Sequence, residues 1–431
     1  MCSPLSEAPM QPAPEIKGWC PGAFAPMQSN DGLLMRAKVI GSRISSRQLS
    51  ALAAISEDCG NGLVDLSQRA QLQLRGVTEA TLQEALKRLD AAGLLPSDAA
   101  AERITNIVAS PLAGIDPAAA FDANALANEL AQALQADVQL RALPAKFLFA
   151  IEDGGALLLR DVDADIRLEA DGANISVSFA GADLSITANV NKAVSVALEL
   201  ARAFVALRGE AFEQRRMGRL VAAVGADAVL KQAGLTATPR QRVTATLRAF
   251  LGARDENGLS YAGVAAPSGR WRAQEVMRLS ALADEHGIGE LRLTPWRAFL
   301  LPTATLAAAE EIIAAAVPLG LILSQEDARL AVVACPGAPE CPQAQGETRA
   351  HLAHLAPLAQ KLAGADGVGL HISGCAKGCA RPKSSAVTLI ASNGLFDLID
   401  HGRASDAPAL TGLTIEAVEK ALATRAEGKH V

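Results

Sequence analysis

The stretch Leu291-Arg-Leu-Thr-Pro-Trp-Arg-Ala-Phe-Leu-Leu301 is a weak repeat of an earlier stretch that begins at Leu63. When Leu63 is laid on Leu291, Arg69 falls on Arg297 and Gly41 on Gly269. In each copy a strand-like run, a run with apolar residues at helical spacing and another strand-like run follow one another. A repeat this long has the size of a domain and is too long for the period of a solenoid. The sequence therefore predicts an internal duplication.

A second match extends the duplication, because Ala109-Ser-Pro111 can be laid over Ala334-Cys-Pro336 at nearly the same offset. We expect each half to contain a strand–helix–strand unit followed by a larger α/β unit. Halves that face each other about a pseudo-twofold axis would form a shared cleft suited to a large ligand. The elements predicted from periodicity are strands at 31–40 and 64–74, helices at 46–59 and 194–207, and antiparallel strands within 154–188.

Composition narrows the class of protein. The chain has 431 residues, enough for two to four domains, and half of it is hydrophobic. Its net charge of −6 favours neither nucleic acid nor a membrane surface as a partner. The most apolar stretch, 306–323, contains Glu310, Glu311 and Pro318, which argues against a membrane span. Residues 1–16 are rich in Pro and Ser and are predicted to be a disordered tail without a signal peptide, so we expect a cytoplasmic protein.

Four of the seven cysteines form two close pairs in the last quarter of the chain, Cys335-Pro-Gly-Ala-Pro-Glu-Cys341 and Gly374-Cys375-Ala-Lys-Gly-Cys379. Each pair follows a predicted strand, at 330–334 and 369–373. Thiolates are ligands for iron–sulfur clusters, zinc and copper(I). The spacings C-x5-C and C-x3-C are unusual for structural zinc, and a reducing cytosol disfavours disulfides. The sequence favours an iron–sulfur cluster, with zinc and free or disulfide-bonded thiols as alternatives.

Other possible ligands carry weaker signals. Trp19-Cys-Pro-Gly22 echoes Cys335-Pro-Gly337, so Cys20 is either functional or a small buried apolar residue. His351 and His354 could share one face of a helix, but surface or capping roles are more common for such a pair. We expect no function for Cys2 and Cys59.

Basic residues recur in and beside the repeated units. A single charged residue on a strand usually faces solvent. Arg297, however, lies in an otherwise apolar run, and the repeat matches it with Arg69. A buried arginine needs an anionic partner, which a ligand with several carboxylates would supply through bidentate pairs. The basic residues concerned are Arg36, Lys38, Arg69, Arg75, Lys146, Arg270, Arg292 and Arg297.

The cysteine pattern resembles that of the sulfite and nitrite reductase hemoproteins. In that family four cysteines hold a 4Fe–4S cluster, and the last of them bridges to a siroheme iron. The resemblance implies an α+β, internally duplicated fold with ferredoxin-like half-domains paired about a pseudo-twofold axis and two α/β nitrite/sulfite-reductase-like domains. It also implies that the cluster ligands are Cys335, Cys341, Cys375 and Cys379.

The predicted boundaries follow from this resemblance and from the duplication. They are a tail at 1–16, half-domain 1 at 17–80, α/β domain 1 at 81–210, a connector at 211–240, half-domain 2 at 241–305 and the cluster-bearing α/β domain 2 at 306–431.

Three basic motifs carry the resemblance further. Leu66-Ser-Gln-Arg-Ala-Gln-Leu-Gln resembles L-T-T-R-Q-x-x-Q, whose arginine contacts the tetrapyrrole or the bound anion, and Arg36 and Lys38 match the family's R-x-R/K strand. Leu143-Pro-Ala-Lys146-Phe-Leu148 resembles P-R-K-F-K with its last lysine replaced. That loss argues against sulfite or nitrite reduction, because a small dianion needs concentrated positive charge. The expected substrate-binding residues are Arg36, Lys38, Arg69, Lys146 and Arg297.

The phrases Gly18-Trp-Cys-Pro-Gly22, Leu293-Thr-Pro-Trp-Arg297 and His401-Gly-Arg-Ala-Ser-Asp-Ala-Pro408 resemble the precorrin-3B synthase branch of that family, and the likeness covers about residues 17–425. It implies an oxygen-dependent monooxygenase that converts precorrin-3A to precorrin-3B, by ring hydroxylation with γ-lactone formation, in aerobic cobalamin biosynthesis. The cluster would relay electrons to a non-heme iron that activates O2. A separate NADH-linked reductase is expected, because no G-x-G-x-x-G follows a strand.

Two other functions stay open at the level of sequence. A siroheme-dependent sulfite or nitrite reductase would carry siroheme in place of the non-heme iron. A non-catalytic iron–sulfur electron carrier would not bind a tetrapyrrole tightly.

Overall fold

The computed structural model describes residues 20–211, 214–240, 249–256 and 258–428, so the predicted tail lies outside the described residues. The described chain falls into two compact units, divided between Asp327 and Ala328. Within the described residues, no helix combines the length and the apolar character that crossing a membrane requires.

Two five-stranded antiparallel sheets share one of the hydrophobic cores of the larger unit. One has the order β1 (Met27–Ser29), β2 (Gly32–Ala37), β5 (Leu72–Val77), β4 (Leu63–Leu66) and β14 (Arg270–Arg272). The other has the order β12 (Gly252–Glu256), β13 (Leu259–Ala265), β16 (Ala298–Thr303), β15 (Glu290–Leu293) and β3 (Arg43–Ser45).

Each of these sheets borrows its last strand from the other copy of the repeat. Strand β14 of the second copy pairs with β4, and β3 of the first copy pairs with β15. Such a reciprocal exchange relates the two copies by a pseudo-twofold axis. The predicted α+β fold with duplicated half-domains is thereby confirmed.

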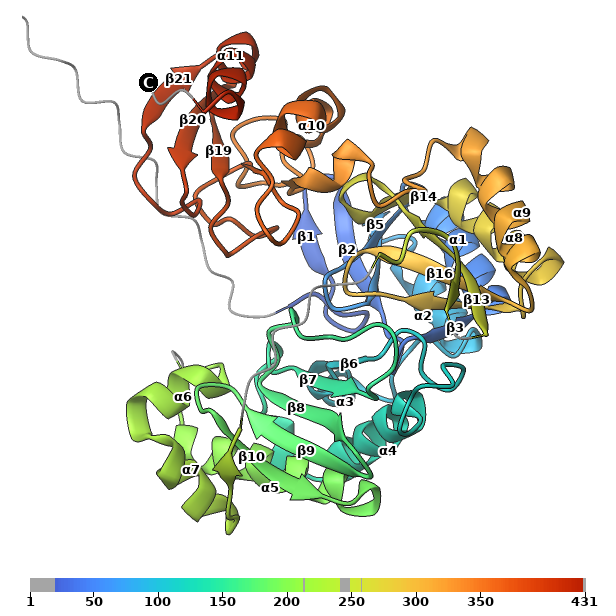
Figure 1. The fold of residues 1–431 in the computed structure, drawn as a ribbon, viewed down its shortest axis with the longest axis vertical. Helices are drawn as coiled ribbons and strands as arrows, with labels where there is room; N and C mark the ends of the chain where they lie inside the picture. The colour runs from blue at the N-terminus through green and yellow to red at the C-terminus, as the bar shows by residue number, and fades with distance from the viewer. Residues whose placement is uncertain (1–19, 212–213, 241–248, 257, 429–431) are drawn as a thin grey trace, which may run out of the picture. The chain divides into compact units, whose positions relative to one another are not determined.

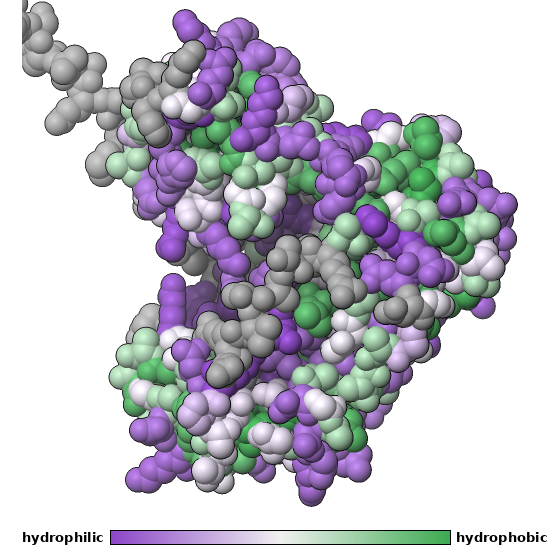
Figure 2. Space-filling model, viewed as in Figure 1, coloured by the Kyte–Doolittle hydropathy of each residue, from purple (hydrophilic) through white to green (hydrophobic). Residues whose placement is uncertain are grey.

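The helices of the two half-domains pack against these sheets, and α1 (Ser46–Cys59) lies beside α8 (Ala273–Glu285) (Figure 1). Helix α1 begins where periodicity predicted it, because Ser45 and Gln48 form a capping box at its start. Its apolar residues Leu49, Leu52 and Ile55 are buried. Helices α2 (Leu82–Ala91) and α9 (Leu306–Ala316) complete the pair of half-domains. Figure 2 shows apolar residues gathered over α9, whose first residue, Leu306, is exposed.

The turn between the last two strands of each half-domain fixes how the copies align. In the first copy, Ser67 N donates to Gln71 O and Ala70 N donates to Ser67 O. The same two bonds recur in the turn 294–298, where Thr294 N donates to Ala298 O and Arg297 N donates to Thr294 O. Ala70 and Arg297 both have a positive φ, 51° and 63°. The structure therefore pairs residue 70 with residue 297, whereas the match of residue types pairs residue 69 with residue 297.

This register corrects two predictions. Arg297 corresponds to Ala70, and Arg69 corresponds to Trp296, so the predicted equivalence of the two arginines is wrong. The identical residue types misled the comparison, whereas the turn geometry determines the alignment. The predicted strand at 64–74 is likewise two strands, β4 and β5, separated by that turn.

The rest of the larger unit is an α/β domain built on a six-stranded sheet with the order β11-β10-β9-β8-β7-β6. Strands β6, β7 and β8 are parallel, and the others are antiparallel. The strands are β6 (Ile107–Ala109), β7 (Phe149–Glu152), β8 (Ile166–Asp171), β9 (Asn174–Phe179), β10 (Leu184–Ala188) and β11 (Thr238–Pro239). Its helices are α3 (Ala99–Ile104), α4 (Ala123–Ala136), α5 (Val190–Arg208), α6 (Met217–Val224) and α7 (Ala226–Ala233).

The smaller unit repeats this architecture with a five-stranded sheet, and its described residues include two α-helices. Strands β17, β18 and β19 are parallel, and β20 and β21 follow antiparallel. The elements are β17 (Val332–Ala334), α10 (Leu352–Lys361), β18 (Leu370–Ser373), β19 (Val387–Ser392), β20 (Leu395–Asp400), β21 (Leu410–Leu413) and α11 (Ile415–Ala426).

Hydrogen bonds confirm that the two α/β domains are copies. Cys335 N donates to Ile372 O at 3.2 Å, and Ser110 N donates to Ile151 O at 2.9 Å. In each case the donor directly follows the first strand of its sheet and the acceptor belongs to the neighbouring parallel strand. Ser110 is therefore the counterpart of Cys335, as the second sequence match predicted.

Candidate functional site

The four predicted cluster cysteines lie on two loops of the smaller unit. Cys335 directly follows β17, and Cys375 follows the neighbouring parallel strand β18 after one glycine. Parallel neighbours deliver the residues after them to the same edge of a sheet. Gly374 N donates to Cys335 Sγ at 3.1 Å, and Gln345 N donates to Gly374 O at 2.9 Å. Strand order thus brings two cysteines from distant parts of the sequence to one place.

Small residues allow these loops to pack closely. A Cβ on Gly374 would lie 2.6 Å from Ala344 Cβ, and a Cβ on Gly337 would lie 2.5 Å from Thr348 Oγ1. Thr348 Oγ1 donates to Cys335 O at 2.6 Å, which fixes the start of the first loop. The spaces that glycine leaves are occupied by neighbouring atoms of the loops.

The thiols lie within electrostatic range of one another. Burial raises the pKa of Cys375, and the nearby Cys341 and Cys335 thiols raise it further. Burial also raises the pKa of Cys379, which interacts with all three of the other cysteines. The six cysteines within the described ranges are free of disulfides. Four thiolates at this spacing would repel one another unless a cationic centre neutralised them.

The donor set at this site is the one that an iron–sulfur cluster uses. Four thiols lie on two neighbouring loops, and a four-iron cluster binds each of four thiolates through a different iron atom. In the part of the chain that the structure describes, no group of three His, Cys, Asp or Glu side chains is arranged to hold a single metal ion. The amide hydrogen of Gly374, aimed at Cys335 Sγ, is a donor of the kind that surrounds cluster sulfurs.

The two histidines considered as ligands have other neighbours. His354 Nε2 lies 3.2 Å from Glu419 Oε2, and the His351 ring packs edge-on against Phe396 with 5.4 Å between ring centroids.

Three cations converge in the larger unit, and we call Arg36, Lys38 and Arg69 the cation cluster. Arg36 is on β2 and Lys38 follows that strand; they are only 8% and 6% exposed. Lys38 Nζ donates to Asn106 Oδ1 at 3.1 Å, whereas Arg36 Nε has no hydrogen-bond partner among the described residues. Arg69, half-buried in the turn between β4 and β5, donates to the carbonyl oxygen of Lys146 at 3.2 Å.

The cation cluster carries more positive than negative charge. Burial lowers the pKa of Lys38 to about 7, and the charges of Arg36 and Arg69 lower it further, against the opposing effect of Glu102. Loss of solvation also lowers the pKa of Arg36 and of Arg69. Cations that have lost this much solvation favour an anion as their partner.

The remaining predicted binding residues lie in different surroundings. Lys146 is exposed, and its carbonyl group rather than its ammonium group makes the contact with Arg69. Leu148 is buried with Val108 and Leu159. Arg297 is half-buried in the turn before β16, so the prediction that it is a buried strand residue is wrong.

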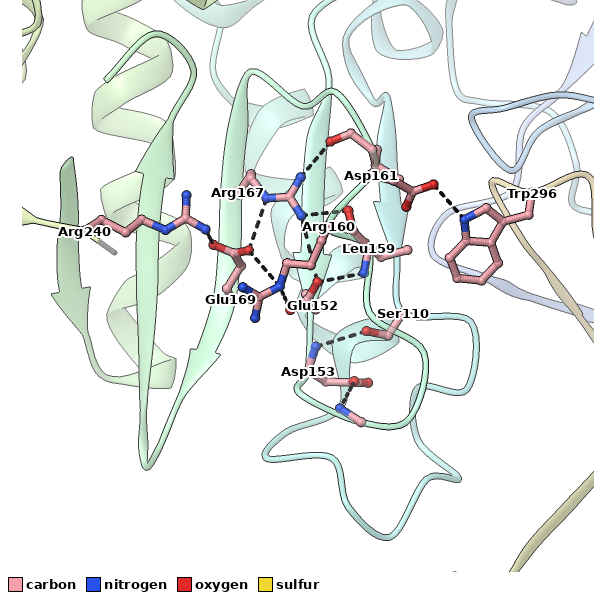
Figure 3. A network of polar contacts seen from close by, with 12 residues as sticks. Ser110, Glu152, Asp153, Leu159, Arg160, Asp161, Arg167, Glu169, Arg240 and Trp296 are labelled. Carbon is pink, nitrogen blue, oxygen red and sulfur yellow. Dashed lines mark hydrogen bonds and ion pairs between the residues drawn. The ribbon is translucent and has the colours of Figure 1, made fainter. Parts of the chain in front are cut away.

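A second polar network lies within the six-stranded sheet (Figure 3). Glu152 accepts from Arg160 Nε at 2.8 Å, and Glu169 accepts from Arg167 Nε at 3.2 Å and from Arg240. The buried carboxylates of Glu152 and Glu169 both have arginine partners, so we interpret this pair of contacts as structural.

The first α/β domain has the same hydrogen bond at the equivalent loop, with a serine hydroxyl in place of the cysteine thiol. Ser110 Oγ accepts from Asp153 N at 3.0 Å, in the way that Cys335 Sγ accepts from Gly374 N (Figure 3). Continuing this pairing along the sequence places Asp116 at the position of Cys341. This pairing gives Ser110 and Asp116 as the counterparts of Cys335 and Cys341.

The sequence analysis did not identify Glu102 and Asn106 as site residues. Glu102 accepts a hydrogen bond from Ala23 N, and Asn106 accepts one from Lys38 Nζ. Both come from the stretch that contains α3 and leads into β6, which carries no recognisable motif. Cys20, by contrast, was singled out from the sequence, and the structure places it in a hydrogen bond with Arg36.

Comparisons with known proteins agree with this fold. Residues 25–92 and 252–319 match the family described as nitrite/sulfite reductase ferredoxin-like half domain. The fold matches the structure of Mycobacterium tuberculosis NirA protein with a TM-score of 0.72 and 18% identity, over 92% of this chain and 81% of that chain. The matched half domains and the fold place the chain in the nitrite and sulfite reductase superfamily.

Two curated relatives narrow the class. A precorrin-3B synthase of Sinorhizobium sp is 30% identical over 410 residues, which is 91% of this chain and 84% of that protein. A ferredoxin–nitrite reductase of Synechococcus elongatus is 28% identical over 390 residues, 83% of this chain and 76% of that protein. The chain belongs to the precorrin-3B synthase family, which confirms the resemblance drawn from its motifs.

Proposed function

We propose that this protein is an oxygen-dependent monooxygenase that converts precorrin-3A to precorrin-3B, by ring hydroxylation with γ-lactone formation, in aerobic cobalamin biosynthesis. The observation that carries the proposal is the similarity to a precorrin-3B synthase over 91% of this chain. The buried cation cluster supports it, because precorrins carry many carboxylates that need cationic partners. We further propose that the protein acts in the cytoplasm.

Cys335, Cys341, Cys375 and Cys379 would hold a 4Fe–4S cluster, which would supply single electrons to the reaction. The close packing of the two loops directs the Gly374 amide at the Cys335 sulfur. We also propose a non-heme iron as the oxygen-activating metal, with O2 as co-substrate and a separate NADH-linked reductase as electron donor.

The role proposed for the basic residues is to neutralise and orient the acidic side chains of the tetrapyrrole. Arg36 offers a buried Nε without a partner among the described residues, and Lys38 lies two residues further on. Arg69 is held in place by two backbone carbonyls, those of Ala145 and Lys146. We propose Lys146 and Arg297 as further substrate-binding residues.

A siroheme-dependent sulfite or nitrite reductase is the second candidate, favoured by the similarity to nitrite reductases. Leu148 argues against it. Where the reductase motif has a second anion-binding lysine, this chain has a leucine that is buried among apolar side chains. A small dianion would find fewer cations here than a reductase requires.

The deciding experiment is anaerobic purification followed by iron, sulfide and pigment analysis, then turnover of precorrin-3A with O2. We expect about four sulfides and at least four irons per chain, without siroheme bands. Cys375→Ser should lose the brown absorbance and the turnover together, whereas Cys59→Ala should keep both.

A siroheme spectrum beside the same cluster would contradict the monooxygenase and support the reductase. Full turnover by Cys375→Ser without a cluster would contradict the role given to the four cysteines.

A further inference from the structure

Residues 20–25 form a short segment that lies on the cation cluster. Gly22 N donates to Ala25 O at 2.9 Å, which closes a tight turn. Cys20, just before this turn, hydrogen bonds with Arg36 and is close enough to Lys38 and Arg69 to act on both electrostatically. The Cys20 thiol therefore lies at the same place as the three cations.

Glu102, at 7% exposure, holds this segment from helix α3. Its Oε1 accepts from Ala23 N at 2.5 Å, and its Oε2 accepts from Phe24 N at 3.2 Å. A Cβ on Gly22 would lie 2.2 Å from Glu102 Oε2, so a side chain at residue 22 would push the carboxylate and the turn apart. Successive amide groups around an anion form a concave nest, which fixes the position of the turn.

Glu102 does not supply the hydrogen-bond acceptor that the cation cluster lacks. Glu102 interacts electrostatically with Arg36 and Lys38, but its oxygens are engaged by the amides of Ala23 and Phe24. Arg36 is more than nine-tenths buried and its Nε still lacks a partner among the described residues. An unmet buried donor beside two further cations indicates an acceptor that the described residues do not supply. A carboxylate fits this position in charge and geometry.

We propose that Glu102 is a positioning residue for a carboxylate-binding site that is formed by the cation cluster and the adjoining Cys20. This inference rests on the proposed function, because the carboxylates would be those of the tetrapyrrole substrate. Bound carboxylate would cover the Cys20 thiol, and release of the segment from Glu102 would uncover it and weaken binding.

The test uses the full-length holoprotein and uroporphyrin III, a tetrapyrrole with eight carboxylates, as the probe. Its dissociation constant is measured by fluorescence quenching, and alkylation of Cys20 by N-ethylmaleimide is followed by mass spectrometry under anaerobic conditions. At a probe concentration ten times the dissociation constant, we expect Cys20 to be alkylated roughly tenfold more slowly. Cys59, which is buried in the apolar core, should not respond to the probe.

Two variants separate positioning from charge. If Glu102 acted only through its negative charge, Glu102→Gln would leave a more positive cluster and bind uroporphyrin more tightly. A positioning role predicts the opposite, about tenfold weaker binding together with faster alkylation of Cys20 in the free protein. Gly22→Ala changes no charge and should produce the same two effects, because its Cβ would displace the turn.

Glu84→Gln is the control, since it removes an exposed carboxylate in the first turn of α2 and should change neither readout. Circular dichroism and tryptophan emission of each variant show whether the fold is kept. Binding of uroporphyrin without protection of Cys20, or tighter binding by Glu102→Gln, would overturn the inference alone. Failure of the wild-type protein to bind uroporphyrin would overturn the tetrapyrrole site and this inference together.

Discussion

Lys38 illustrates what burial does to a single cation. An ammonium group with a pKa of about 7 is neutral in a large share of molecules at physiological pH. A bound carboxylate would stabilise the charged form and raise that pKa. Binding of an anion is therefore linked to uptake of a proton by Lys38.

The first prediction follows from this linkage. Between pH 7 and 9 the probe carboxylates stay ionised while unliganded Lys38 loses its proton, so each binding event must restore it. The dissociation constant of uroporphyrin III should rise roughly 10–50-fold across this range. Titration calorimetry in buffers of different ionisation enthalpy measures the proton uptake directly.

Lys38→Arg supplies the control for this prediction, because guanidinium keeps its proton over the whole range. Its affinity should be nearly independent of pH from 7 to 9. If the variant showed the same pH dependence as the wild type, Lys38 would not be the linked group.

Asp153 shows the opposite case of a buried acid, whose pKa burial raises to about 6. The folded protein then binds this proton more tightly than the unfolded chain does, so stability from this group is present at low pH. That stability is lost as pH rises through 6. Between pH 5 and 8 the wild type should lose about 1–2 kcal/mol relative to Asp153→Asn. Urea unfolding of both proteins at the two pH values measures the difference, and an unchanged difference would contradict the assignment.

At the scale of elements, the two cysteine loops depend on glycine where they touch. Gly374→Ala would place a Cβ 2.6 Å from Ala344 Cβ, and the loop that carries Cys375 must then move away. We expect this variant to lose most of its cluster absorbance on purification. Gly364→Ala is the matched control in the same unit, because its Cβ would meet nothing closer than 3.9 Å. Equal cluster content in the two variants would contradict the close packing of the loops.

Elements with local signals were predictable from the sequence. Helix α1 was predicted with correct bounds, since its apolar spacing and the Gly60 that ends it lie together in one short stretch, 46–60. The turn at 67–71 was missed because Ala70 adopts a positive φ without the glycine that usually marks one. The one-position error in the repeat has the same origin, as a turn residue was aligned by residue type alone.

The part of the candidate site that carries local sequence signals was also predictable. Cysteines at the ends of two strands are read from the sequence, and so are basic residues on a strand such as Arg36. The contact of Glu102 with Ala23 joins residues far apart in the chain and depends on how α3 packs. No local pattern carries that information, which is why the anchor of the Cys20 segment appeared only in the structure.

At the scale of the larger unit, the exchange of β3 and β14 makes two half-domains into one structure. Arg270 on β14 donates to both carboxylate oxygens of Asp65 on β4, at 2.9 and 3.1 Å. Arg75 lies 3.6 Å from the same carboxylate and makes a bidentate pair with Asp31. Neither sheet is complete without a strand from the other copy, so we expect the two half-domains to unfold together.

Hydrogen exchange on the intact protein tests this cooperativity. Arg270→Gln leaves the buried Asp65 with a weaker partner, which should destabilise the β14–β4 edge and, through the exchange, β15 and β3 as well. We expect protection in β4 and in β15 to fall together by roughly ten- to a hundredfold, corresponding to the loss of a buried charge pair. Arg278→Gln removes an exposed pair with Glu285 and should leave both strands unchanged. Loss of protection in β4 alone would mean that the half-domains open independently, and the exchanged strands would then serve only as contacts between two separate folds.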